Sequence, residues 1–187
     1  MNQSTFVKVD RETFFRFVTN APEDERYEWV GGRIVQQQAG GTKRHARIGA
    51  RFLEAAHRQL DRDLWDAFAE RGVETHNTVR YADVVVEPVG GDSDSLAATA
   101  PSLIVEVLSR TSSDRDLNEK PDEYLQLATL QAYIVASQDE PACLVWVRQP
   151  DGTFPAEPTE ITGTTSTILV PDLKLAFSLA DIYRGSN

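Results

Sequence analysis

Three acidic residues lie inside stretches of sequence that otherwise have the composition of buried β-strands. Asp83 interrupts the run YADVVVEP, Glu106 interrupts LIVEVLS, and Glu28 lies in RYEWV. Each needs a partner, because an isolated carboxylate is costly to remove from water. If the strands of Asp83 and Glu106 are neighbours, two carboxylates about 4 Å apart repel by several kcal/mol at an effective dielectric constant of about 20. Either one acid is protonated or a cation lies between them.

A hard divalent cation, magnesium or manganese, suits such a pair of carboxylates. Magnesium prefers oxygen ligands, needs only one or two protein carboxylates and keeps water for its remaining positions. A bound ion of this kind can activate water and stabilise charge on a phosphate. The alternative is a set of strand acids that face solvent, for which Glu87 is an example. Spacing alone leaves both interpretations open.

A lysine follows in the segment TSSDRDLNEKPDEY, residues 111–124. Ser113 lies three residues before Asp116, in the spacing of a capping box. Pro121 cannot lie deep inside a helix, because it lacks the N–H donor and clashes with the carbonyl four residues earlier. The helix therefore either bends at Pro121 or starts late, with Asn118 as its N-cap and Lys120 in its first turn.

A lysine at this position can take part in phosphate chemistry. The ammonium of Lys120 could orient an attacking water or stabilise charge that develops on a phosphate. The alternative for Lys120 is a solvated helix charge paired with Glu123 or Asp116. The combination of Asp83, Glu106 and Lys120 favours a catalytic site over three unrelated surface charges.

Hydrophobic periodicity predicts the elements that position these residues. We expect a helix over 10–20 capped by Asp10, a hairpin that turns at Gly31 and Gly32, and a long helix over 42–60. A further helix should end near residue 128, and a short one should close the chain between Ser178 and Gly185. Segments with strand composition are WDAFAE, VETHN, ADVVVEP, SLIVEVLS, AYIVAS, CLVWVRQ and a last pair, EITG and STILV. This pattern is typical of an α/β or α+β fold.

The long helix has an apolar stripe and a basic side. The stripe consists of Ile48, Phe52, Ala55, Ala56 and Leu60, and the basic side of Lys43, Arg44, Arg47 and Arg51. The arginines could meet a phosphate backbone, but an ordinary solvated face needs no such role. His45 shares the apolar stripe, where a half-buried histidine with satisfied hydrogen bonds is more common than a metal ligand.

Length and composition limit the class of protein. A chain of 187 residues is expected to form a single domain over 1–187 with one core. No segment has the signature of a signal peptide or a membrane span, and the single cysteine, Cys143, lies in an apolar run, so we expect a cytoplasmic protein. The net charge of -10 disfavours unspecific binding of nucleic acid, so a nucleic-acid site would need local positive groups or bound metal.

Several of these stretches together resemble a known family. YADVVV, PSLIVEVLS, the spacing D-x-x-x-K-x-x-x-Y of Asp116, Lys120 and Tyr124, and the closing LADIYRG are similar to the Uma-two family of restriction endonuclease-like proteins. YEWVGGRIV and HARIGARFLEAA extend the resemblance over residues 12–184. It implies the PD-(D/E)XK nuclease fold: a mixed central sheet flanked by helices, here with additional antiparallel strands.

The resemblance also implies roles for individual residues. Asp83 and Glu106 would bind magnesium, with the carbonyl of Val107 as a further ligand. The lysine of the broader fold lies two residues after the acid, at Leu108 here, and the family pattern moves it to Lys120.

Other positions complete this comparison. Glu28 matches an early acid that can complete such sites. Ala82 stands where a proline usually precedes the metal-binding aspartate, and Arg110 stands where a proline is expected after EVLS. Arg110 could therefore add a phosphate contact.

Two functions are consistent with these features. The first is a magnesium-dependent endonuclease that hydrolyses phosphodiester bonds of nucleic acid, DNA rather than RNA. The second is a nuclease-fold protein that no longer cuts and acts as a binding or assembly module, as a homodimer. The acid, acid and lysine set favours the first, and the net charge of -10 favours the second. No base-reading motif identifies a substrate sequence.

Overall fold

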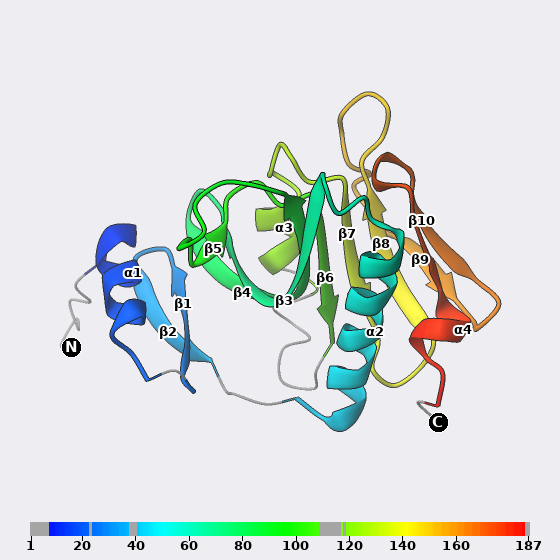
Figure 1. Cartoon of the computed structure of the whole chain (residues 1–187), viewed down its shortest axis with the longest axis horizontal. Helices are drawn as coiled ribbons and strands as arrows, with labels where there is room; N and C mark the ends of the chain where they lie inside the picture. Colours follow the sequence, from blue (N-terminus) through cyan, green and yellow to red (C-terminus); the bar gives the residue numbers. More distant parts are fainter. Residues whose placement is uncertain (1–7, 23, 38–40, 109–116, 118, 186–187) are drawn as a thin grey trace, which may run out of the picture.

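A computed structural model describes residues 8–22, 24–37, 41–108, 117 and 119–185. A mixed sheet runs through the centre, with helix α2 on one face and the short helix α3 on the other (Figure 1). The described N-terminal and C-terminal ends lie at opposite ends of the long axis. Within the described ranges, no helix is both long and apolar enough to cross a membrane. The predicted α+β architecture with a mixed sheet flanked by helices is confirmed.

The N-terminal part consists of one helix against one hairpin. Helix α1, Arg11–Thr19, begins at Asp10, whose side chain accepts a hydrogen bond from the Thr13 backbone N–H, as predicted. Strands β1, Arg26–Val30, and β2, Arg33–Gln37, form the predicted antiparallel hairpin. Gly31 and Gly32 have φ values of 56° and 89°, which glycine adopts at little cost.

The strand order is β2-β1-β4-β6-β7-β8-β9, and β3 pairs with β4 and with β5. The central strands are β4, Thr78–Pro88, β6, Leu103–Val107, β7, Ala132–Ala136, and β8, Ala142–Val147. Strand β4 runs antiparallel to β6, whereas β6 runs parallel to β7. A parallel pair needs a crossover connection, and the chain between β6 and β7 includes α3, Lys120–Tyr124. The site acids therefore lie on inner strands.

Two of the predicted strands are one element. WDAFAE and the first two residues of VETHN, Val73 and Glu74, fall within a single strand β3, Trp65–Glu74, that pairs with almost the whole length of β4. The register pairs Ala69 with Val84 and Arg71 with Ala82, and Glu70 between them has a φ of 51°. This local irregularity divides the sequence pattern without ending the strand. A two-residue strand β5, Ala97–Ala98, lies on the other side of β3.

Helix α2, Lys43–Gln59, is the long helix of the prediction and covers one face of the sheet. It begins at Thr42, whose hydroxyl accepts a hydrogen bond from the His45 backbone N–H. All five residues of its predicted stripe are buried: Ile48, Phe52, Ala55, Ala56 and Leu60. They pack on sheet residues such as Val84 and Val105, so the apolar face predicted from spacing is the face that meets the core.

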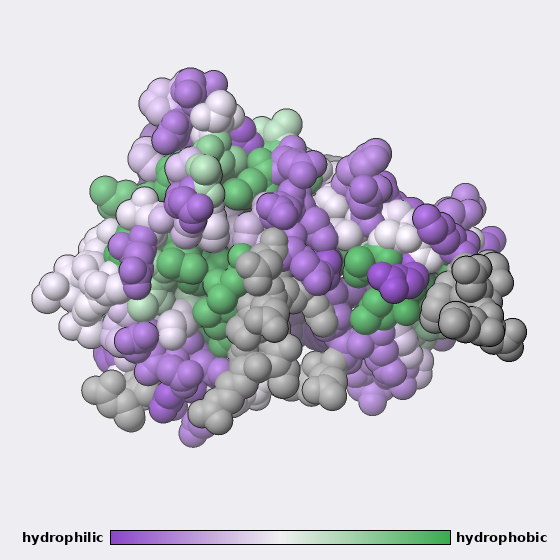
Figure 2. Space-filling model, turned by 180° about the vertical axis from the view of Figure 1, so that it is seen from behind, coloured by the Kyte–Doolittle hydropathy of each residue, from purple (hydrophilic) through white to green (hydrophobic). Residues whose placement is uncertain are grey.

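The opposite face of the sheet has a second, more aromatic core. Tyr133 lies between Tyr124 and Trp146, with ring centroids 5.4 Å from each. Helix α3 supplies Tyr124 and ends there, so the prediction that the helix continues to about residue 128 is wrong. Seen from the side away from α2, apolar residues form patches separated by hydrophilic ones (Figure 2).

The C-terminal strands pair differently from the prediction. Strand β9, Thr159–Thr162, adds to β8, whereas β10, Thr167–Val170, pairs with β11, Leu175–Ser178. EITG and STILV are therefore not partners. The 3-10 turn Pro171–Leu173 joins β10 to β11, and Lys174 after it has a φ of 54°. The closing helix α4, Leu179–Ile182, follows Ser178, whose side chain makes no capping hydrogen bond.

Candidate metal centre

The two strand acids lie where β4 and β6 begin to separate. The antiparallel register pairs Val84 with Val105, Val85 with Ile104 and Val86 with Leu103. Asp83 and Glu106 are the next residues beyond the Val84–Val105 pair, at the same end of this ladder. The expectation that their strands are neighbours is confirmed.

Asp83 of β4 contacts both strand β6 and helix α2. Its Oδ2 accepts a hydrogen bond of 2.6 Å from the backbone N–H of Val107, and its Oδ1 lies 3.0 Å from Nε2 of His45. The side chain of Asp83 is 22% exposed and that of His45 is 19% exposed. His45 is thus the half-buried histidine that the sequence favoured, and its partner is the candidate metal ligand.

Gly49 of α2 faces Asp83. A Cβ built on Gly49 would meet only the Cβ of Asp83, at 4.0 Å. Glycine inside a helix costs roughly 1 kcal/mol relative to alanine. Gly49 therefore leaves the half-buried side of Asp83 without a covering side chain from the helix.

Glu106 faces the other side of the sheet, where it meets α3. The side chain is 5% exposed, and its Oε1 lies 2.6 Å from Nζ of Lys120, which is 7% exposed. Lys120 also donates to the carbonyl of Tyr81 at 3.4 Å. Tyr124 donates its hydroxyl to the same Oε1 at 3.5 Å. Burial, and then the charge of Glu106, raise the pKa of Tyr124, which keeps the hydroxyl as a donor.

The local structure of α3 explains how Lys120 reaches Glu106. The helix starts at Lys120, with Pro121 in its first turn, which is the late-start alternative. Its N-cap position is Glu119, while Asn118 lies outside the described residues. Leu108, the position of the lysine in the broader fold, is half-buried and packs against the aromatic core. The solvated interpretation of Lys120 is wrong, since its side chain is buried in contact with Glu106.

Glu28 lies nearby but bonds to a different cation. It is 3% exposed, and it accepts from the backbone N–H of Tyr81 at 3.2 Å and from Nε2 of Gln37 at 2.8 Å. Nη1 of Arg80 lies 3.5 Å from its Oε2. Glu28 therefore supports the strand next to the site and shares its charge with Arg80.

Arg80 was missed by sequence reasoning. It is 2% exposed and contacts Glu28, Glu119 and Glu123. Burial of the guanidinium would lower its pKa, but the hydrogen bonds and charge of Glu123, with Glu28 and Glu119, raise it above the ordinary value. The available signal was an arginine inside the apolar strand TVRYADVVV, which needs buried acids as partners.

The oxygens at this end of the ladder are of the kind that a hard divalent ion prefers, but Asp83 faces α2 whereas Glu106 faces α3. Among the described residues, no three histidine, cysteine or acidic side chains converge on one point. In this structure the Asp83 oxygens are bonded to His45 and to the Val107 N–H, and Oε1 of Glu106 is bonded to Lys120. Two carboxylates completed by water are sufficient for magnesium.

The charges around the centre also favour a cation. The acids Glu28, Glu106, Glu119 and Glu123 surround two bases, Arg80 and Lys120. With Asp83, the candidate centre has five acidic side chains and two basic ones. The side chains around the candidate centre therefore carry more acids than bases.

The basic side of α2 is largely engaged within the protein. Arg44 pairs with Asp139 at 3.3 Å, and both side chains are exposed, at 42% and 63%. Arg47 donates to the carbonyl of Gly185, and Arg51 donates to that of Ile182 at 3.1 Å. The contacts of Arg47 and Arg51 hold α2 against the C-terminal segment, whereas Arg44 contacts the connection between β7 and β8. Ser113, Asp116 and Arg110 lie outside the described residues.

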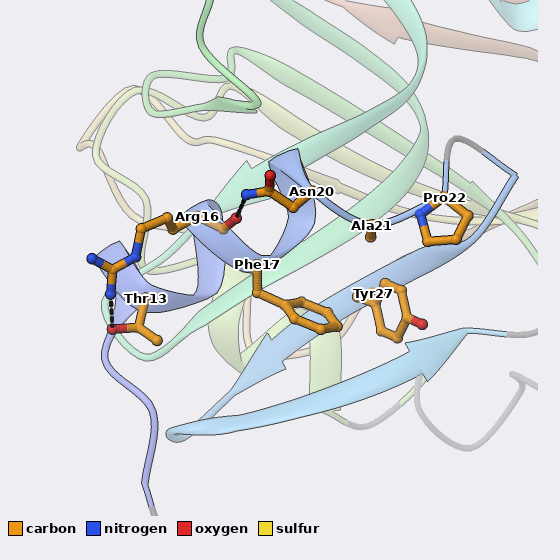
Figure 3. Close-up of a pocket in the computed structure, with 7 residues that line it drawn as sticks. All are labelled: Thr13, Arg16, Phe17, Asn20, Ala21, Pro22 and Tyr27. Atoms are coloured by element: carbon orange, nitrogen blue, oxygen red, sulfur yellow. Dashed lines mark hydrogen bonds between the residues drawn. The ribbon is translucent and has the colours of Figure 1, made fainter.

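A separate open pocket of about 430 Å³ lies beside α1 (Figure 3). Phe17 and Tyr27 form its apolar part, with ring centroids 4.8 Å apart and nearly perpendicular planes. Phe17 is 40% exposed whereas Phe14 of the same helix is buried, so the apolar side chains of α1 are only partly covered. Tyr27 and Glu28 point to opposite faces of β1, so this pocket does not open onto the candidate metal centre.

Comparison with known proteins gives one family match. A model of the Uma2 family, described as "Putative restriction endonuclease", matches residues 11–180. An uncharacterized protein of Synechocystis, sll1609, is 33% identical over 127 residues, which are 61% of this chain and 67% of that protein.

A solved structure has a similar fold. It is the crystal structure of a protein from Anabaena variabilis, described as a "putative nuclease belonging to DUF820", and superposes with a TM-score of 0.68 at 16% identity. The match covers 91% of this chain and 97% of the other. This likeness establishes a nuclease-like fold.

Proposed function

The chain belongs to the Uma2 family, described as "Putative restriction endonuclease", and we propose that it is a metal-dependent endonuclease that hydrolyses phosphodiester bonds. The observation that carries the proposal is a chain of contacts that links Asp83 to β6 and links Glu106 of β6 to Lys120. Asp83 is hydrogen-bonded to Val107, the residue next to Glu106, and Glu106 is paired with Lys120. The proposed substrate is nucleic acid, DNA rather than RNA, in the cytoplasm.

In this proposal, the carboxylates of Asp83 and Glu106 and the carbonyl of Val107 hold magnesium or manganese. The bound ion would supply an activated water and stabilise negative charge on the phosphate. His45 and the Val107 N–H orient the Asp83 carboxylate. Glu28 supports the site through the backbone N–H of Tyr81.

Lys120 supplies the positive charge of the proposed site. In the described structure its ammonium is bonded to Glu106 and to the Tyr81 carbonyl, which holds it beside the site. When Glu106 binds a metal ion, the same ammonium can orient water or stabilise charge on the phosphate. Lys120 reaches the site from a helix, whereas the lysine of the broader fold would lie at the position of Leu108.

Contacts with the phosphate backbone are proposed for Arg44, Arg47 and Arg110. The Arg44–Asp139 pair is exposed, and exposed pairs contribute only about 0 to 1 kcal/mol. A phosphate can therefore take the place of Asp139 at little cost. Two copies of the chain would act as a homodimer on a double-stranded substrate.

The second candidate is a nuclease-fold binding module that does not cut. It is favoured by the buried Glu106–Lys120 pair, in which each charge already has a partner, and by the net charge of -10. Metal binding and cleavage distinguish the two candidates.

The first experiment follows the melting temperature during titration with magnesium or manganese. Wild type should be stabilised, by about 2.7 kcal/mol at a metal concentration 100 times the Kd. Asp83→Ala and Glu106→Ala should lose the shift, whereas Glu160→Gln, an exposed acid of β9, should keep it. Absence of a shift in wild type, or its persistence in both site variants, would overturn the metal centre.

The second experiment tests cleavage. Single-stranded, double-stranded and structured DNA and RNA are incubated with metal and with wild type or Lys120→Ala. Cleavage that requires metal, Asp83 and Lys120 supports the enzyme. Metal binding without cleavage of any substrate supports the binding module, and cleavage unaffected by Lys120→Ala removes Lys120 from the mechanism.

A further inference from the structure

We propose that Arg80 is the positioning residue for Lys120, and that it acts by holding Glu119, the N-cap residue of α3, and Glu123, which lies three residues after Lys120. This inference rests on the proposed function for its catalytic meaning. The physical claim, that Arg80 fixes the place of Lys120, can be tested without any activity.

Helix α3 cannot fix its own position. It has five residues, no side chain caps its N-terminus, and Pro121 lies in its first turn. Helices shorter than about 12 residues are marginal on their own in water. The orientation of Lys120 therefore depends on tertiary contacts of α3.

Arg80 provides such contacts on both sides of Lys120. Its Nε lies 2.6 Å from Oε2 of Glu123 and its Nη2 lies 2.7 Å from Oε1, a bidentate pair. The same Nη2 lies 2.9 Å from Oε2 of Glu119. A planar guanidinium that bonds to two acids one helical turn apart restrains both rotation and translation of the turn between them.

Arg80 is itself held firmly. Its side chain is 2% exposed, and its Nη1 lies 3.5 Å from Oε2 of Glu28 on β1. Thr78, two residues earlier on β4, donates its hydroxyl to Glu123 at 2.9 Å. Arg80 is also three residues before Asp83 on the same strand. The strand that carries one candidate metal ligand thus sets the position of the helix that carries the lysine.

The groups that Arg80 contacts differ from the groups that the ammonium of Lys120 contacts. Its guanidinium bonds to Glu28, Glu119 and Glu123. Glu119 lies one residue before Lys120, and Glu123 lies three residues after it. The ammonium of Lys120 bonds to Glu106 and the Tyr81 carbonyl. Arg80 therefore acts on Lys120 through the helix backbone.

The chain offers a direct measurement of this effect. It contains four lysines, and Lys8, Lys43 and Lys174 are exposed whereas Lys120 is buried. Each can be followed by mass spectrometry after brief treatment with an amine-acetylating reagent. The three exposed lysines are internal standards, and Lys120 should react at least about tenfold more slowly than they do in wild type.

Three variants loosen the restraint to different degrees. Glu119→Gln removes one acceptor at a side chain that is 60% exposed and so should leave the fold intact. Glu119→Gln/Glu123→Gln removes both, and Arg80→Lys removes the planar geometry but keeps the charge. Asp122→Asn, an exposed residue of α3, is the matched control.

We expect Lys120 acetylation to rise about tenfold or more in Arg80→Lys and in the double variant, since a bidentate charge-assisted pair is lost. The rise should be smaller in Glu119→Gln and absent in Asp122→Asn. Thermal unfolding of each variant distinguishes local release from global destabilisation. A rise in acetylation at unchanged melting temperature supports the proposal. If Arg80→Lys does not fold, the two glutamine variants decide the result.

Three results would overturn the proposal. Lys120 could react as fast as the exposed lysines in wild type, its reaction could be unchanged in the double variant, or it could rise only in proportion to global unfolding. In the cleavage assay, Glu119→Gln should lower kcat and leave KM unchanged. An unchanged kcat with faster acetylation of Lys120 would show that the contacts of Arg80 with Glu119 and Glu123 do not matter for catalysis. If wild type shows no cleavage at all, the proposed function fails, and acetylation alone decides whether Arg80 positions Lys120.

Discussion

Lys120 and Glu106 form a buried ion pair, with 2.6 Å between Nζ and Oε1, although they come from a helix and from an inner strand of the sheet. Between them lies a connection of which residues 109–116 and 118 fall outside the described structure. A charge that is left alone in such a place is strongly unfavourable. The pair therefore makes α3 and β6 depend on each other.

This dependence predicts the effect of removing one partner. Lys120→Met should lower the free energy of unfolding by about 3 to 5 kcal/mol in metal-free buffer, because Glu106 stays buried without its cation. Glu106→Gln/Lys120→Met should recover much of that loss, since neither position then has a charge. Urea denaturation of the wild type, Lys120→Met, Glu106→Gln and the double variant measures the coupling energy between the two residues. Purely additive effects would contradict a coupled pair.

Gly49 predicts a separation between stability and metal binding. Gly49→Ala should raise the free energy of unfolding by roughly 0.5 to 1 kcal/mol through helix propensity, since a Cβ meets only an ordinary contact there. Gly49→Leu should fill the space beside Asp83 and weaken magnesium binding, measured by calorimetry. Ala50→Leu, on the exposed side of the same helix, is the control and should leave binding unchanged. Equal affinities of Gly49→Leu and wild type would show that the ion does not bind beside Gly49.

Cys143 predicts a loss of stability at alkaline pH. Burial raises the pKa of its thiol to about 11 from the ordinary 9.0, although the hydrogen bond with Tyr183 acts in the opposite direction. Well below pH 9 the thiol is protonated in both states. Between pH 9 and about 11 the unfolded chain loses its proton first, so the free energy of unfolding falls with rising pH, by roughly 3 kcal/mol in all.

Unfolding of wild type and Cys143→Ala at several pH values measures the contribution of Cys143 together with its effect on the hydrogen-bonded Tyr183, because groups away from Cys143 titrate similarly in both proteins. The difference between the two proteins should shrink from pH 9 to pH 11. The native thiol should also fail to react with a thiol reagent at pH 8 until denaturant is added. Rapid reaction of the native protein would contradict the burial of Cys143.

Arg44 predicts a change in salt dependence, if the proposed nucleic-acid contact is made. Arg44→Ala should weaken DNA binding and reduce the slope of log K against log salt by about 0.9 for one lost phosphate contact. Arg58→Ala removes an exposed arginine from the other end of α2, where it pairs with Glu54, and should leave the slope unchanged. Identical slopes for Arg44→Ala and wild type would exclude Arg44 from the interface.

The local elements were predictable because their causes lie within short stretches of chain. Asp10 and Thr42 are capping residues directly before apolar periodic segments, and Gly31–Gly32 allows the positive φ values of a tight turn. The interruption at Glu70 and the pairing of β9 with β8 were not predictable. Both depend on which strand lies alongside, and this is decided by contacts distant in sequence.

The sequence by itself determined the acids and the lysine of the candidate centre, since charges inside apolar segments require partners wherever the chain folds. Only the tertiary structure decided which residues are those charge partners. Lys120 meets Glu106 because α3 begins late, while Arg80 takes the three glutamates around it. Ion pairs of this kind form across separate elements, and their choice depends on distances that no spacing along the chain encodes.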